Sequence, residues 1–238
     1  MMWGGGQMTD GTGSAGVGTA GTGTVGTGGG GGAEQTVGGF LDALASAAPA
    51  PGGGAAAALQ AALGAALVSM VCNLTIGKPR YAEHEATMLA ARADAEKTRL
   101  RALTLAEEDA DAFGAVTDAY KLPRDSEAAK AARSAAIQAA LRLAADVPLR
   151  TAEAAADVVQ LCARILDGAN VNVLSDVAVA AASAQAALAS ADINVRVNAV
   201  SMTDEPTRAA LLAELDRHLA IGDAAEEIVR TVRERIEG

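Results

Sequence analysis

Residues 51–79 read PGGGAAAALQAALGAALVSMVCNLTIGKP and contain no charged side chain before Lys78. Alanine is the strongest helix former, and glycines in front with Gly77 and Pro79 behind are typical helix boundaries. The stretch therefore predicts a helix from about Ala55 to Ile76. Because no face of this helix carries a charge, we expect protein to surround it, partly its own chain and partly a second subunit.

The remainder of the folded part also has helical periodicity and contains no convincing strand. Residues 177–191 form a second charge-free segment, whereas the last predicted helix is amphipathic. Pro148 interrupts one predicted helix, which should kink or break there. We expect an all-α, up-and-down-like bundle of about six helices, packed as a homodimer. The predicted helices cover 34–47, 55–76, 79–120, 126–166 after an N-cap at Asp125 or Ser126, 177–191 after an N-cap at Ser175 or Asp176, and 204–236.

Composition narrows the class of protein. Only 2% of the 238 residues are aromatic, so the core must consist of Ala, Leu, Val and Ile. Fifteen of the 26 glycines fall within the first 32 positions. We therefore expect residues 1–33 to form a disordered glycine-rich tail and residues 34–238 to form one helical domain. The formal net charge of -10 disfavours nucleic acid as a partner.

A membrane span has to be weighed, because residues 43–77 carry no charge. Prolines and glycines interrupt the first half of this segment and alanine dominates the second half, so we predict burial inside soluble protein and no membrane partner. Cys72 and Cys162 lie in apolar helical patterns and fit neither a disulfide framework nor zinc-ligand spacing. This favours a reducing, cytoplasmic compartment.

Polar groups gather at predicted helix ends in three places. Gly52–Gly54 allow close backbone approach at a helix start, where free N–H groups favour an anion, although these glycines could also form a hinge. Residues 73–81 end the charge-free helix with an amide, a hydroxyl, two cations and a phenol, for which C-terminal capping is the alternative. Residues 168–176 contain two asparagines, which a turn and an N-cap do not require.

A fourth candidate is the acidic run at residues 107–111, which Phe113 and Tyr120 follow on the same predicted helix. Such a run is usually a solvated face whose ion pairs contribute little to stability. The aromatic residues among the acids indicate that part of this helix turns inward. A half-buried carboxylate there would have a raised pKa and could exchange protons near neutral pH.

In this order, these pieces resemble the cyclodeaminase/cyclohydrolase family of folate enzymes, over about residues 40–198. The family includes the cyclodeaminase half of formiminotransferase-cyclodeaminase and the free-standing methenyltetrahydrofolate cyclohydrolases. The motifs are PGGG at 51–54, NLTIGK at 73–78, Asp109 with Ala112-Phe113, YKLPR at 120–124, Ser175-Asp176, and Asn194-Val195 through Asn198. The chain departs from the family pattern at Asn170-Val171-Asn172 and at Ala199. The resemblance implies a homodimer whose site lies between subunits.

The chemistry of this family takes place at the carbon held between N5 and N10 of tetrahydrofolate. It needs a proton-transfer group, fixed nitrogens, and cations for the glutamate tail. Under the resemblance, Asp109 transfers the proton, Asp176 orients Asp109 or the substrate, and Lys121 meets carboxylates or tunes the acid. The residues implied to bind substrate are Gly52, Gly53, Gly54, Asn73, Lys78, Tyr120, Arg124 and Ser175.

Three functions compete under this interpretation. We predict first a formiminotetrahydrofolate cyclodeaminase, which releases ammonia and gives 5,10-methenyltetrahydrofolate. The alternatives are a methenyltetrahydrofolate cyclohydrolase and a catalytically silent helical dimer that binds folate or a protein partner. We expect no metal ion, and no cofactor beyond the tetrahydrofolate-derived substrate.

Overall fold

The computed structural model describes residues 35–238, so the tail predicted at residues 1–33 lies outside the described residues. Helices dominate this part of the chain and no strand occurs in it, which confirms the all-α prediction. The α-helices are α1 (Val37–Leu44), α2 (Gly53–Asn73), α3 (Glu85–Lys121), α4 (Glu127–Ile165), α5 (Leu174–Ala199), α6 (Glu205–Leu219) and α7 (Gly222–Glu237). Two 3₁₀ turns, η1 (Pro79–His84) and η2 (Val171–Val173), precede α3 and α5.

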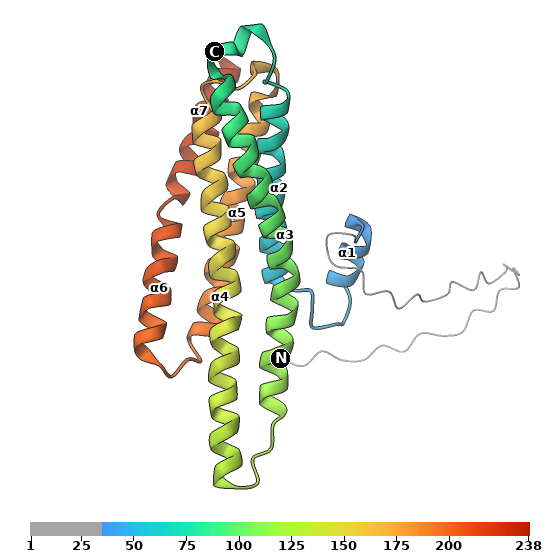
Figure 1. Cartoon of the computed structure of the whole chain (residues 1–238), viewed down its shortest axis with the longest axis vertical. Coiled ribbons are helices and arrows are strands. Elements are labelled where there is room, and N and C mark those ends of the chain that lie inside the picture. Colours follow the sequence, from blue (N-terminus) through green and yellow to red (C-terminus); the bar gives the residue numbers. More distant parts are fainter. Residues whose placement is uncertain (1–34) are drawn as a thin grey trace, which may run out of the picture.

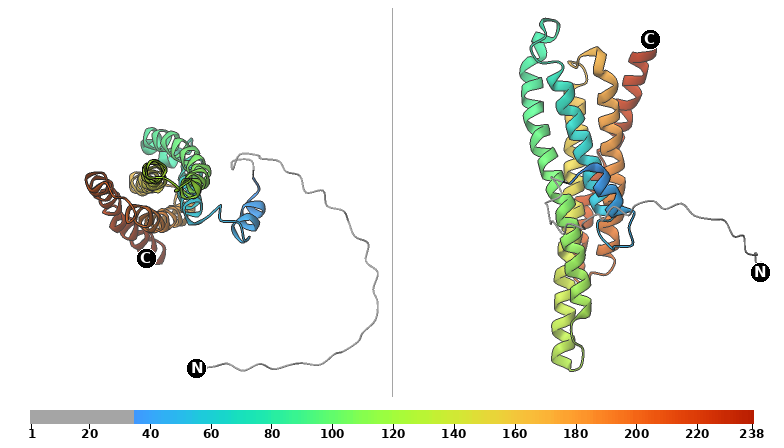
Figure 2. Two further views of the ribbon diagram at one scale, coloured as in Figure 1. Left: turned by 90° about the horizontal axis from the view of Figure 1, so that it is seen from below. Right: turned by 90° about the vertical axis from the view of Figure 1, so that its right-hand side faces the viewer.

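Four long helices, α2 to α5, run along a common axis and form the bundle (Figure 1). The α2 helix packs against α3, α4 and α5, while α6 and α7 pack against α4 and α5. The α3–α4 hairpin projects beyond the other helices at one end, and α1 stands apart from the bundle (Figure 2). The bundle therefore has one long projection and one detached helix.

Small side chains bring α2 close to its neighbours. Its alanines at positions 55, 57, 58, 61 and 65 are fully buried. A methyl group at Gly64 would lie 2.9 Å from Val158 Cγ1 and 3.0 Å from the Ala180 carbonyl oxygen, closer than ordinary packing allows. The charge-free stretch therefore fills the core by close approach of helix backbones rather than by bulky side chains.

Of the predicted kink or break at Pro148, the break is wrong, because α4 runs without interruption from Glu127 to Ile165. Proline cannot donate a hydrogen bond to the carbonyl four residues earlier. Here the carbonyl of Ala144 accepts a hydrogen bond from Asn198 Nδ2 at 2.9 Å instead. The predicted N-cap at Ser126 is confirmed, since its hydroxyl accepts from the Ala129 N–H at 3.1 Å.

Two other helix boundaries differ from the prediction. The α5 helix begins at Leu174, one residue before Ser175, and its N-cap residue is Val173. The predicted caps Ser175 and Asp176 therefore lie inside the first turn, because the η2 turn already directs the chain into the helix. The single helix predicted for 204–236 is divided into α6 and α7, which allows the apolar side of each to reach the bundle.

The α2 and α5 helices pack side by side in opposite directions: Gly64 of α2 approaches Ala180 of α5, and Gly53 approaches Asn194. Both present uncharged side chains to the outside. This charge-free face comprises Ala56, Leu59, Gln60, Leu63, Ala66, Leu67, Met70 and Asn73 of α2 with Ser175, Val179, Ala182, Ala186, Ala189, Ile193 and Val197 of α5, all exposed or half-buried.

By length and composition alone, α2 and the segment from Val171 to Ala199 are apolar enough to cross a membrane. The most apolar window of α2 is 61% buried inside the bundle, as in the core helix of a soluble protein. The absence of a membrane partner stays a prediction.

Candidate active site

One carboxylate of α3 caps the start of α2. Asp109 Oδ2 accepts a hydrogen bond from the Ala55 N–H at 3.0 Å. The N-cap residue of α2, Gly52, has no side chain to satisfy the free N–H groups of the first turn, so Asp109 supplies the acceptor from another helix. Gly54 makes room for it, because a side-chain carbon at this position would overlap the Asp109 carboxylate.

The surroundings of Asp109 alter its acidity. Burial of the carboxylate raises its pKa, and the hydrogen bond from Ala55 opposes this shift without cancelling it. Asp109 is thus half-buried with a raised pKa, as expected from the sequence for part of the acidic run. Such a group can take up and release a proton closer to neutral pH than an exposed aspartate.

An amide from α5 lies on the other side of the same helix start. A side-chain carbon at Gly53 would lie 3.6 Å from Asn194 Nδ2. This Nδ2 donates to the Ser190 carbonyl at 2.8 Å, which fixes the amide orientation. The sequence contained this asparagine as part of a motif, but nothing in the spacing assigned it to the start of α2.

The opposite end of α2 holds a second group of the predicted residues. Asn73 Oδ1 accepts from Arg92 Nη1 at 3.1 Å, and Lys78 is exposed on the loop that follows. Ser175 and Asp176 belong to the start of α5 at this same end. Arg92 was not among the predicted site residues, since it lies on a face of α3 that carries several charges.

A buried amide organises this end of the bundle. Asn170 is 3% exposed, and its Nδ2 donates to the Leu74 carbonyl at 2.9 Å. Its backbone N–H donates to Thr75 Oγ1 at 3.1 Å, and its Oδ1 accepts from the Tyr81 hydroxyl at 3.3 Å. Asn170 thus joins the end of α2 to both 3₁₀ turns, which position Lys78 and Asp176.

We expect Asn170→Ala to lower the free energy of unfolding by about 1–3 kcal/mol, because it leaves the Leu74 carbonyl and the Tyr81 hydroxyl without this partner. Asn172→Ala is the matched control, since Asn172 is exposed in the same turn. Urea unfolding of both variants measures the difference. Equal stability of the two variants would contradict the structural role of Asn170.

The third group lies at the tip of the α3–α4 hairpin. Tyr120, Lys121 and Arg124 are all exposed, and Lys121 Nζ pairs with Asp118 Oδ1 at 2.9 Å. The distance from Asp109 to Lys121 along α3 is on the order of 18 Å, so Lys121 cannot tune Asp109 within one chain.

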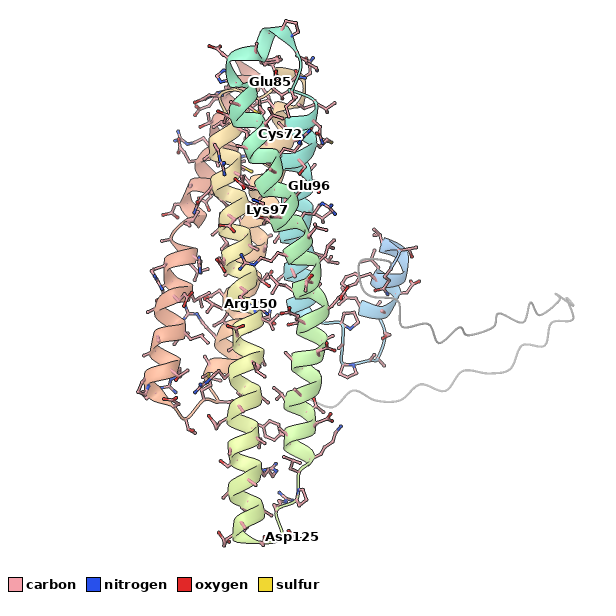
Figure 3. The ribbon with its side chains drawn as sticks, viewed as in Figure 1. Cys72, Glu85, Glu96, Lys97, Asp125 and Arg150 are labelled. Atoms are coloured by element: carbon pink, nitrogen blue, oxygen red, sulfur yellow. The ribbon has the colours of Figure 1, made fainter. Side chains whose placement is uncertain are left out.

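Figure 3 shows how far apart the three groups are. Cys72 marks the end of α2, Asp125 marks the hairpin tip, and Arg150, which pairs with Glu108 beside Asp109, marks the level between them. Asp176 lies near the Cys72 level, on the order of 20 Å along the bundle from Asp109. The hypothesis that Asp176 orients Asp109 therefore fails within a single chain.

No three His, Cys, Asp or Glu side chains within residues 35–238 form a group that could hold a metal ion. Both cysteines are free and buried, and burial raises the pKa of Cys72 to about 11 and that of Cys162 to about 12. The described residues that remain as candidates are the half-buried Asp109 carboxylate, the amides, and the cations at two ends.

Fold and site together define an all-helical bundle with a half-buried carboxylate of raised pKa at a glycine-rich helix start. The chain belongs to the formiminotransferase-cyclodeaminase family, whose model matches residues 36–217. This confirms the resemblance found in the motifs.

The comparisons include free-standing and fused relatives. The chain is 45% identical over 203 residues to methenyltetrahydrofolate cyclohydrolase of Methylorubrum extorquens, covering 85% of this chain and 98% of that protein. It is 34% identical over 172 residues to formimidoyltransferase-cyclodeaminase of Mus musculus, covering 72% of this chain but only 32% of that larger protein. A solved formiminotetrahydrofolate cyclodeaminase of Thermotoga maritima matches with a TM-score of 0.78 and 30% identity, over 87% of this chain and 99% of that one.

Proposed function

We propose that this protein is a folate one-carbon enzyme that hydrolyses 5,10-methenyltetrahydrofolate. The observation that carries the proposal is the Asp109 carboxylate, held half-buried at the start of α2 with a raised pKa. A general acid or base with these properties is what the reaction requires at the carbon between N5 and N10. Hydrolysis takes first place because the relative named as a cyclohydrolase matches at 45% identity along nearly its whole length.

Asp109 acts as the base in the first step. It takes a proton from water while the water oxygen bonds to the methenyl carbon, which becomes tetrahedral. The bond from this carbon to N5 then breaks, the remaining hydroxyl proton passes to N5, and a formyl group stays on N10. Gly52 and Gly53, which are not buried, leave the backbone at the start of α2 open to a flat ring beside Asp109.

Ammonia release is the second candidate, and the 30% identical Thermotoga structure favours it. In that reaction N10 attacks the formimino carbon and the bond to the departing nitrogen breaks. The N10 proton and one proton from a protonated Asp109 would pass to this nitrogen, which leaves as ammonia and leaves the methenyl cation behind. Both reactions use one carboxyl group at one carbon, so the same site geometry serves either.

The working unit in this proposal is a homodimer with two-fold symmetry. The charge-free face of α2 and α5 offers an uncharged surface, exposed or half-buried, against which a second copy can pack. If two α2 helices pack in opposite directions, the Asn73 end of one chain lies beside Asp109 of the other. The partner subunit's Lys78 and the partner subunit's Asp176 then lie at the level of Asp109, so these two groups form one site, while Lys121 lies on the order of 18 Å further along the projecting hairpin.

The test is to mix the purified full chain separately with 5,10-methenyltetrahydrofolate and with 5-formiminotetrahydrofolate, and to follow the methenyl absorbance. We expect its loss from the first substrate at a rate far above the spontaneous reaction. Appearance of absorbance from the second substrate would assign cyclodeamination instead. Binding without a change in either sample would overturn both reactions and support the silent dimer.

A further inference from the structure

The α1 helix has an apolar side that its own chain buries only in part. Val37, Phe40, Leu41 and Leu44 have the spacing that places them on one face. None of the eight residues of α1 is buried, and Val37 and Leu41 are 78% and 54% exposed. The helix is nevertheless well formed, since the Thr36 hydroxyl accepts from the Gly39 N–H at 3.0 Å. A formed helix with an unburied apolar face suggests a partner outside the chain.

A groove of about 620 Å³ lies between α1 and the bundle. Val37 and Leu41 of α1 form one wall, and Leu59 and Leu63 of α2 with Leu103 of α3 lie opposite. Leu63 is 61% exposed even though it lies at the middle of the most apolar helix of the bundle. The groove is thus open and mostly apolar, so it suits an apolar helix rather than a charged segment.

The groove continues the charge-free face. Ala56, Leu59, Gln60, Leu63 and Ala66 belong to both, and Ala106 and Ala110, which flank Asp109 on α3, also line the groove. A partner that covers the α2 part of the charge-free face therefore also enters the groove, next to Ala106 and Ala110.

We propose that α1 is an arm that clasps the partner subunit's α2. This rests on the homodimer of the proposed function. In a two-fold arrangement of opposed α2 helices, the second half of one helix lies over the first half of the other. Met70 of the partner subunit then enters the groove between Leu41 and Leu63. The arm holds the partner's Asn73 and Lys78 beside Asp109, which a single chain cannot do.

The direct test is cysteine cross-linking in the full chain. Leu41→Cys and Met70→Cys are placed on separate copies, co-expressed and treated with a short bismaleimide. We expect a covalent dimer from this pair and none from either variant alone, because the two copies of each position lie at opposite ends. Co-expression of Leu41→Cys with Leu143→Cys is the matched control, since Leu143 is 60% exposed on α4 and does not line the groove.

A second variant tests the energetic role of the arm. Leu41→Asp is expected to raise the dimer dissociation constant at least about tenfold, because a carboxylate would enter an apolar groove. Ile236→Asp is the control, since Ile236 is exposed on α7. At protein concentrations low enough for both variants to be monomers, their thermal unfolding should be the same. Activity lost in Leu41→Asp should return when the protein concentration is raised.

The outcomes separate this inference from the proposed function. If the wild-type chain is a dimer but Leu41→Cys and Met70→Cys give no cross-link, the proposal for the arm is overturned and the homodimer stands. A stable monomer in analytical ultracentrifugation would overturn the arm and the proposed homodimer together. Flotation of that monomer with phosphatidylcholine vesicles would assign the same face to lipid and also overturn the arm.

Discussion

Asp109→Asn is expected to lower turnover at least about 100-fold, because general acid–base catalysis by one positioned group contributes about 10²–10⁴ in rate. Asparagine keeps the size of the side chain and an oxygen that can accept from the Ala55 N–H, so the start of α2 should stay in place. What the site loses is the group that takes up and releases a proton. The measurement is steady-state hydrolysis of 5,10-methenyltetrahydrofolate across a range of pH.

The same variant should be at least as stable as the wild type at neutral pH. The folded state raises the pKa of Asp109 above its usual value near 3.8. At pH values between the usual and the raised pKa, the folded protein therefore binds more protons than the unfolded chain. Stability therefore falls as the pH rises from about 3.8 through the raised pKa, and the ionised carboxylate remains unfavourable above it. Asparagine removes this pH dependence, which thermal unfolding at several pH values would measure.

Asp111→Asn is the control, because Asp111 lies two residues further along α3 and is exposed. It should keep wild-type turnover. Full activity in Asp109→Asn would remove Asp109 from proton transfer. A large loss in Asp111→Asn as well would indicate an effect of charge on α3 as a whole rather than of one carboxyl group.

Gly54→Ala is expected to lower turnover by about as much as Asp109→Asn does. It would do so by displacing the Asp109 carboxylate rather than by removing it. The added methyl group would overlap the Asp109 carboxylate, so either α3 or the start of α2 must move. A displacement of about 1 Å at a catalytic group can lower the rate about 100-fold, and overpacking lowers the free energy of unfolding by about 1–3 kcal/mol. Turnover and urea unfolding measure the two effects.

Gly114→Ala provides the comparison, since nothing lies within 4 Å of a side-chain carbon at Gly114. Alanine in this helix interior should raise the free energy of unfolding by about 0.5–1 kcal/mol without changing turnover. If Gly54→Ala behaved like Gly114→Ala, the close contact between Gly54 and Asp109 would have no part in activity.

The helices that could be predicted are those whose own sequence determines them. Alanine propensity and the flanking glycines were enough to place α2, and Ser126 was enough to place the start of α4. The continuity of α4 at Pro148 could not be predicted, because the donor that compensates is Asn198, which lies far along the chain on α5. The division between α6 and α7 has only Gly222 as a local signal, inside an otherwise regular pattern.

The site could be predicted as a set of residues but not as an arrangement. The pairing of Asp109 with the start of α2 depends on where α3 crosses α2, and no local pattern encodes that crossing. The turn at Asn170 was predicted as polar, yet the side chain is buried and joins three segments. The remaining candidates lie partly at the Asn73 end of α2 and partly at the tip of the α3–α4 hairpin. This separation depends on the lengths and directions of the packed helices, which the sequence motifs do not give.

The hydrogen bond from Asn198 to the Ala144 carbonyl, which Pro148 cannot serve, has a consequence for how this sequence can change. Asn198 Nδ2 donates to the Ala144 carbonyl at 2.9 Å and to the Asn194 carbonyl at the same distance. If Asn198 is replaced, the Ala144 carbonyl in α4 loses its hydrogen-bond donor, unless Pro148 is also replaced by a residue with a backbone N–H. Substitution of Asn198 alone should therefore be tolerated poorly. Relatives without a proline at the position of Pro148 should be free to vary at the position of Asn198, so we expect the two positions to change together.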